Sequence, residues 1–163
     1  MSKRVITPPD NPTLDDSDPP VVFLGGPIQG APDWQAKAIE LLGDKLIVAN
    51  PRRAIIDPAT FNFEEQVDWE TQWLYEAARS GCIVFWLCNQ ETEHPERVYA
   101  QTTRIELGEW VHRSRLEWGR RVVIGIDSNF PGAKYIRYRF RKEAAIFSTL
   151  EETVEHACDL AWR

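Results

Sequence analysis

Glu106 has the sequence surroundings of a nucleophilic carboxylate. Thr103 precedes it by three residues, which is the spacing of a capping box at the start of a helix. The helix dipole favours the ionised form of a carboxylate in the first turn, and a nucleophile must be ionised. Ile105 and Leu107 flank Glu106 with apolar surface, and Gly108 leaves space nearby. Helix capping alone would also explain Thr103 and Glu106.

Glu70 is a second carboxylate in an unusual place. Residues 63–79 have the periodicity of a helix, with Val67, Leu74 and Ala78 on the stripe expected to face a sheet. Glu70 lies on the same stripe. Because burying an unpaired charge is costly, we expect Glu70 to pair with a cation or hydroxyl, or to open into a cavity. Alternatively, it lies at the edge of the stripe and reaches solvent.

Two further features are compatible with a ligand. Trp69 and Trp73 lie one helical turn apart, where they would either wall a pocket for a flat base or pack in the core. The glycine-rich segment 25–30 would either approach a ligand closely or form a plain tight turn. It lacks the Lys-Ser/Thr of a phosphate-binding P-loop and the spacing of a dinucleotide fingerprint, so nucleoside triphosphates and NAD are poorly supported.

Strand and helix patterns alternate along the chain. Strands are predicted at 21–24, 46–49, 82–87, 121–126 and 144–147, and helices at 32–42, 63–79, 104–116 and from a capping box at Ser148 and Glu151 onward. This alternation requires long right-handed crossovers between parallel strands. The predicted fold class is therefore α/β, a flavodoxin/Rossmann-like three-layer sandwich with a mostly parallel sheet of about five strands. Ligands of such folds bind at the carboxyl ends of the strands.

The length of 163 residues suits one domain. Residues 1–20 hold five prolines and four aspartates and few apolar residues, which predicts a flexible N-terminal tail followed by a single domain over 21–163. No apolar run has the form of a signal peptide or the length of a membrane span. We therefore expect a soluble, cytoplasmic protein.

Charge and the scattered cysteines and histidines exclude several classes of ligand. A net charge of −6 argues against a nucleic acid polymer as partner. One basic cluster, formed by Arg137, Arg139, Arg141 and Lys142, alternates with apolar residues. This alternation favours the exposed face of an extended segment over the alternative of a phosphate-binding site. The three cysteines and three histidines lack the spacings of disulfide frameworks and zinc sites, so no metal and no cofactor are expected.

Three segments, taken in order, resemble one known family. They are Phe23–Pro27, Val67–Glu70 leading into Ile83–Leu87, and Thr103–Trp110, and together they look like the nucleoside 2-deoxyribosyltransferase-like proteins over about Val21 to Ile126. The Glu-Leu-Gly element at residues 106–108 is the most specific part, because in that family it carries the nucleophile. The resemblance therefore implies a homo-oligomeric enzyme that transfers 2-deoxyribose between nucleobases through a covalent intermediate on Glu106.

The resemblance also suggests roles for other residues. Glu70 or Asp68 would protonate the leaving base or hold its edge, with Glu70 preferred because it faces inward. Residues at the strand ends and beside the two carboxylates are candidates for substrate binding: Gly25, Gly26, Pro27, Gln29, Asn50, Arg52, Trp69, Trp73 and Thr103. Exposed aromatic residues would supply a subunit interface, including Tyr135, Tyr138 and Phe140.

The chain departs from that family at some positions. The better-known transferases have an aspartate near the position of Trp73 and another acid where this chain has residues 99–102. Two other functions remain open: an N-glycosidase that passes the sugar to water, with Arg52, Arg53 or Arg104 holding a 5′-phosphate, and an inert nucleotide-binding module.

Overall fold

A computed structural model describes residues 4–163 of the protein. Its centre is a six-stranded, all-parallel sheet with the order β1-β3-β2-β4-β5-β6. The strands are β1 (Arg4–Ile6), β2 (Val21–Gly25), β3 (Ile47–Ala49), β4 (Cys82–Leu87), β5 (Val122–Ile126) and β6 (Ala145–Phe147). The predicted α/β class is confirmed, with one strand more than expected. Every residue of the central strands β2, β4 and β5 is buried, as expected for strands covered on both faces.

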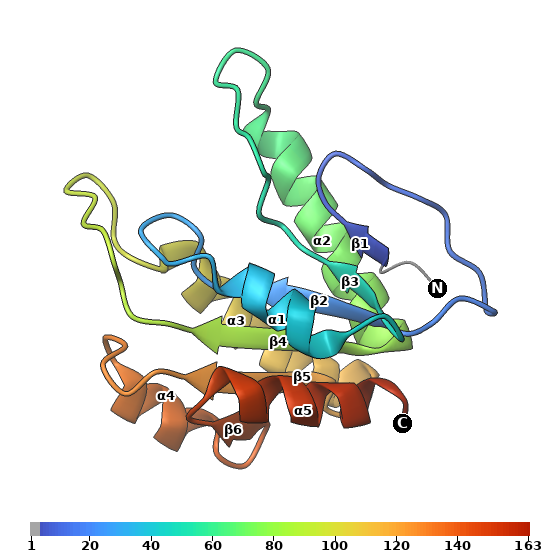
Figure 1. The fold of residues 1–163 in the computed structure, drawn as a ribbon. Helices are drawn as coiled ribbons and strands as arrows, with labels where there is room; N and C mark the ends of the chain where they lie inside the picture. Colours follow the sequence, from blue (N-terminus) through green and yellow to red (C-terminus); the bar gives the residue numbers. More distant parts are fainter. Residues whose placement is uncertain (1–3) are drawn as a thin grey trace.

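Five helices form the outer layers of the sandwich (Figure 1). They are α1 (Trp34–Leu42), α2 (Phe63–Ser80), α3 (Gln101–Glu117), α4 (Ala133–Phe140) and α5 (Leu150–Ala161). Buried side chains of α2, α3 and α4 pack on one face of the sheet, and those of α1 and α5 pack on the other. Among residues 4–163, no helix has the length and apolar character needed to cross a membrane.

The N-terminal segment is part of the domain. Residues 4–6 form the edge strand β1, in register with Ile47–Ala49 of β3, and Ile6 is buried. The indole of Trp69 donates a hydrogen bond to the carbonyl of Asp10 at 2.7 Å, which fastens the following loop to α2. The predicted flexible tail is therefore wrong from residue 4 onward, because a three-residue strand is too short to show a period in sequence. The part of that prediction on residues 1–3 falls outside the described residues.

The basic segment near the C-terminus is helical. Residues 133–140 form α4, with Ile136 and Phe140 buried and Tyr135 and Tyr138 exposed. The expected extended segment is wrong, because positions 136 and 140 also satisfy the four-residue spacing of a helix. Phe140 therefore belongs to the core and not to an exposed surface. The final helix begins one residue later than expected, with Thr149 as its N-cap and Glu152 as the partner.

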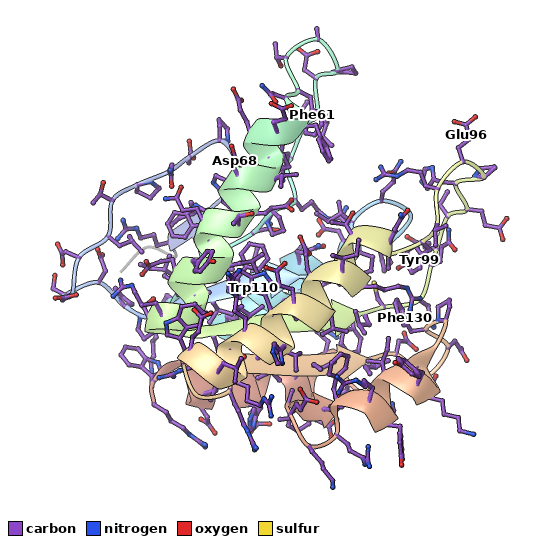
Figure 2. All side chains as sticks on the ribbon, turned by 180° about the vertical axis from the view of Figure 1, so that it is seen from behind. Phe61, Asp68, Glu96, Tyr99, Trp110 and Phe130 are labelled. Carbon is purple, nitrogen blue, oxygen red and sulfur yellow. The ribbon has the colours of Figure 1, made fainter. Side chains whose placement is uncertain are left out.

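The order of the strands places a topological switch between β2 and β4. The connection after β2 leads to β3 on one side, whereas the connection after β4 leads to β5 on the other. Because the two neighbouring loops run in opposite directions from such a point, a crevice opens between them at the carboxyl ends of the strands. The loop that leads into α2 and the loop 88–100 project beyond this edge of the sheet, as Figure 2 shows for Phe61 and Glu96.

Candidate active site

A cavity of about 630 Å³ opens at this switch point. That volume lies within the range of small-molecule sites. Its walls come from the segments after β2 (Gly25–Gln29), after β3 (Pro51–Phe63) and after β4 (Gln90–Thr103), together with Gln66, Val67 and Glu70 of α2 and Glu106 of α3. The cavity therefore lies at the carboxyl ends of the strands, where a ligand of this fold is expected to bind.

Glu70 and Glu106 meet at the base of the cavity. Glu70 comes from α2 and Glu106 from α3, both are half-buried, and both line the cavity close enough for each carboxyl group to perturb the pKa of the other. Each helix is anchored by apolar neighbours next to its glutamate: Leu74 packs in the core below Glu70, and Leu107 does so beside Glu106. The amphipathic packing of two helices thus brings two acids together.

The pair is suited to hold a single proton. Burial, and then the negative charge of Glu70, raise the pKa of Glu106 to about 8. Burial also raises the pKa of Glu70, although hydrogen bonds from Gln66 and Glu106 and the charge of Arg53 oppose this rise. Two carboxyl groups in contact do not readily ionise together, so near neutral pH the pair carries one proton and one negative charge.

A relay of side chains supports Glu70. Arg53 donates through Nε to the amide oxygen of Gln66 at 2.7 Å, and the amide nitrogen of Gln66 donates to Glu70 at 2.8 Å. The same nitrogen also donates to the carbonyl of Pro51 at 3.1 Å. These contacts fix the orientation of the amide and keep Glu70 as the hydrogen-bond acceptor. Sequence reasoning missed Gln66, although its position four residues before Glu70 places both on one helix face.

The environment of Glu106 differs from the expected one. Helix α3 begins at Gln101, its N-cap Ala100 has a left-handed backbone with φ of 56°, and no side chain caps it. Thr103 is therefore a buried residue within the first turn, and Glu106 lies beyond that turn. The predicted capping box is wrong. So is the expectation that the dipole favours ionised Glu106, because dipole effects fade beyond the first turn and burial dominates.

Tyr99 fixes the start of α3. Its hydroxyl donates to the carbonyls of Cys88 at 2.9 Å and Asn89 at 3.2 Å, and its ring packs against Phe130. These contacts tie the end of loop 88–100 to the end of β4, next to the cavity that Tyr99 also lines (Figure 2). No periodicity or motif in the sequence marked this residue.

Several of the expected substrate-binding residues do line the cavity: Gly25, Gly26, Pro27, Gln29, Arg52 and Thr103. The packing of the protein also requires glycine at positions 25 and 26, because a side chain there would collide with neighbouring residues. A Cβ at Gly26, where φ is +153°, would lie 2.5 Å from the carbonyl oxygen of Trp86, and a Cβ at Gly25 would lie 2.7 Å from the ring of Phe85. Neither glycine therefore needs a ligand to explain it.

Four of the expected site residues lie elsewhere. Asp68 is exposed on α2, whereas Trp69 and Trp73 are buried in the core, with their ring centroids 6.0 Å apart. Asn50 accepts a hydrogen bond from the backbone of Arg52 at 3.0 Å and stabilises the turn after β3. None of the four lines the cavity. The tryptophans pack inward because their side of α2 faces the sheet, so the prediction that they form a pocket wall is wrong.

The sequence of this region matches a family model. The model describes nucleoside 2-deoxyribosyltransferase-like proteins and matches residues 19–120. The chain belongs to this family. All of the cavity-lining residues of this nucleoside 2-deoxyribosyltransferase-like protein lie inside the matched span, which runs from β2 to the end of α3. No curated protein matches its sequence.

The remaining titratable residues of this family member form no obvious metal centre. Within residues 4–163, no group of three or more histidine, cysteine, aspartate or glutamate side chains is placed to hold a metal ion.

Proposed function

We propose that this protein transfers 2-deoxyribose between nucleobases, with Glu106 as nucleophile and Glu70 as acid and base. The observation that carries the proposal is the pair of adjacent carboxyl groups, Glu70 and Glu106, in the lining of a cavity of nucleoside size. Membership of the family supports the same substrate class. A retaining transfer needs one ionised and one protonated carboxyl, and the pair holds the single proton that this requires.

The first half of the reaction consumes that proton. It passes from Glu106 to the neighbouring carboxylate of Glu70, which leaves Glu106 ionised. A carboxylate oxygen of Glu106 then bonds to C1′ of the sugar while the bond from C1′ to the base nitrogen breaks. The electron pair of the broken bond goes to the base, and Glu70 donates its proton to the base.

The second half reverses these steps with another base. A nitrogen of the incoming base attacks C1′, the bond from C1′ to Glu106 breaks, and ionised Glu70 accepts the proton of the incoming base. Two displacements at C1′ retain its configuration. Partial burial of the pair supports this chemistry, because a less hydrated carboxylate is a stronger nucleophile and a raised pKa favours proton donation near neutral pH.

The test is to incubate the protein with deoxyinosine, with and without free adenine. The expected result is deoxyadenosine in the presence of adenine, and a mass increase on Glu106 equal to a deoxyribosyl group when the acceptor is omitted. Release of free deoxyribose without any acceptor product would identify an N-glycosidase instead. Binding of nucleoside without turnover, unchanged in Glu106→Ala, would identify a binding module and reject the mechanism.

Two further expectations accompany this function. We propose a homo-oligomer located in the cytoplasm. Exposed Tyr135 and Tyr138 on α4 are available to an interface, whereas buried Phe140 is not. The number of subunits follows directly from the mass in solution, measured by light scattering.

A further inference from the structure

The arginines around the cavity have different tasks. Arg52 has a structural role. Its guanidinium donates hydrogen bonds to the side chain of Gln35 at 2.9 Å and to the carbonyls of Ile28 and Pro32 at 3.2 and 3.0 Å. Arg104 donates to the carbonyl of Pro131 at 2.7 Å and does not line the cavity. Neither is available to a ligand at the carboxylate pair.

Arg53 remains available inside the cavity. Its Nε donates to Gln66, and its guanidinium lies over the ring of Phe61 at 5.6 Å. These two contacts fix the plane of the group. Its terminal Nη1 and Nη2 atoms make no hydrogen bond or ion pair with the described residues, although Arg53 is half-buried. A planar fork of this kind matches the oxygens of a phosphate.

The charge of the cavity also favours an anion. Its lining has three arginines, Arg52, Arg53 and Arg97, against the two glutamates that share one proton. Arg52 is partly neutralised by Asp33 at 3.5 Å, which leaves the charges of Arg53 and Arg97 against the one negative charge of the glutamate pair, although the whole chain has a net charge of −6. Such local excess attracts an anionic substrate.

The position of Arg53 indicates which part of the substrate it binds. Gln66 alone separates Arg53 from Glu70, and the positive charge of Arg53 acts on the Glu70 carboxyl. In a deoxynucleotide, the sugar alone separates the 5′-phosphate from C1′. Arg53 and the carboxyl pair line the same cavity, so a deoxynucleotide with C1′ at the pair would direct its 5′-phosphate to Arg53.

We propose that Arg53 binds a 5′-phosphate, and that the preferred substrates are 2′-deoxynucleoside 5′-monophosphates rather than free nucleosides. This inference rests on the proposed function, because it assumes that C1′ reacts at Glu106. Arg97 is the less suitable phosphate ligand, because it is exposed, contacts Gln29 and belongs to a loop that also carries Glu93 and Glu96.

The experiment compares kcat/KM for deoxyinosine 5′-monophosphate and for deoxyinosine. We expect the wild type to prefer the monophosphate at least about tenfold, and Arg53→Gln to reduce that ratio by roughly ten- to a hundredfold, the usual effect of losing hydrogen bonds to a charged group. Because Arg53 also supports Gln66, the ratio is the informative quantity, since a general loss of activity affects both substrates equally. Arg53→Lys should give an intermediate ratio, because it keeps the charge without the fork.

Matched variants identify the ligand residue. Arg104→Gln, outside the cavity, should keep the wild-type ratio. A ratio that falls in Arg97→Gln and not in Arg53→Gln would overturn the assignment to Arg53. A wild type that prefers the nucleoside, or a ratio insensitive to Arg53, would overturn the whole inference.

Binding measurements separate this inference from the proposed function. Calorimetry with the Glu106→Gln variant should show the monophosphate binding at least about tenfold more tightly than the nucleoside, with the difference lost in the Arg53→Gln double variant. Inorganic phosphate should compete weakly with the monophosphate. If the wild type cleaves neither substrate but this binding difference is present, the proposed function fails and the phosphate site stands. Equal binding of both ligands overturns the phosphate site.

Discussion

Gln66 and Glu70 lie one turn apart on α2, and the amide of Gln66 donates to the Glu70 carboxylate at 2.8 Å. Because Arg53 holds the oxygen of that amide at 2.7 Å, the amide nitrogen faces Glu70. Gln66 therefore favours the ionised form of Glu70, so that the proton of the pair lies on Glu106 in the free protein. Substrate binding must move this proton to Glu70 before Glu106 can act as nucleophile.

Replacing Gln66 should change the pH dependence of the reaction. In Gln66→Leu, Glu70 loses a donor that stabilises its charge, so its pKa should rise further. The basic limb of the kcat/KM profile should move to higher pH by up to about 1 to 2 units, since a hydrogen bond to a charged group is worth about 1.5 to 3 kcal/mol. Profiles of wild type and variant measured between pH 5 and 10 give the shift. An unchanged basic limb would show that Gln66 does not act on the pair.

Glu70→Gln should remove the proton donor while leaving the nucleophile. We expect kcat to fall by roughly 10²- to 10⁴-fold with deoxyinosine, the usual contribution of general acid catalysis. A deoxyriboside of 4-nitrophenol, whose leaving group departs without protonation, should recover most of the lost rate. Glu106→Gln should not be rescued by it.

Asp68→Asn is the comparison for Glu70→Gln. Asp68 lies on the same helix but on its exposed side, so activity should remain within about twofold of the wild type. A large loss of activity in this variant would contradict the assignment of Glu70, and not Asp68, as the acid.

The folded protein should become less stable as pH rises through neutrality. Because the pKa of Glu106 is about 8 in the folded protein and near 4.5 when unfolded, the folded state binds more protons than the unfolded state between these values. The free energy of unfolding therefore falls as pH increases over this window, by an amount on the order of a few kcal/mol. The contribution of Glu106 to the free energy of unfolding is therefore highest below about pH 4.5. Urea unfolding of wild type and Glu106→Gln at several pH values measures the difference; equal slopes would contradict the raised pKa.

Tyr99→Phe should loosen the start of α3. The variant removes a donor from the carbonyls of Cys88 and Asn89 and should cost about 1 to 3 kcal/mol of stability. Because the same contact holds the loop beside the cavity, amide exchange should accelerate over residues 89–100 and kcat/KM should fall. Exchange that accelerates evenly along the chain would indicate only a general loss of stability.

The sequence was most informative where one local signal decides the outcome. The continuous apolar run 82–87 became β4 with the predicted bounds, and the helix predicted from Phe63 became α2. The inward position of Glu70 was also visible, because a carboxylate on an apolar stripe is anomalous. Its pairing with Glu106 was not, because the contact joins two helices whose relative position depends on the whole sheet.

The errors have a common physical origin. Trp69 and Trp73 have the residue type of a base-stacking wall, but the side of α2 they occupy packs against Phe23 and the sheet. Thr103 and Glu106 have the spacing of a cap, but the helix starts earlier, at a left-handed Ala100 that no motif marks. In each case the local pattern allowed two outcomes and tertiary packing selected one.

The parallel sheet separates the cavity from the C-terminus. All strands end at the edge where the cavity opens, and α5 runs back from that edge to the opposite one, as Figure 1 shows. Exposed Trp162 and Arg163 therefore lie behind the mouth and not beside it. A tag or surface linker attached after Arg163 would hold the protein with its opening toward the solution, which makes the C-terminus the suitable point for immobilisation in ligand-binding measurements.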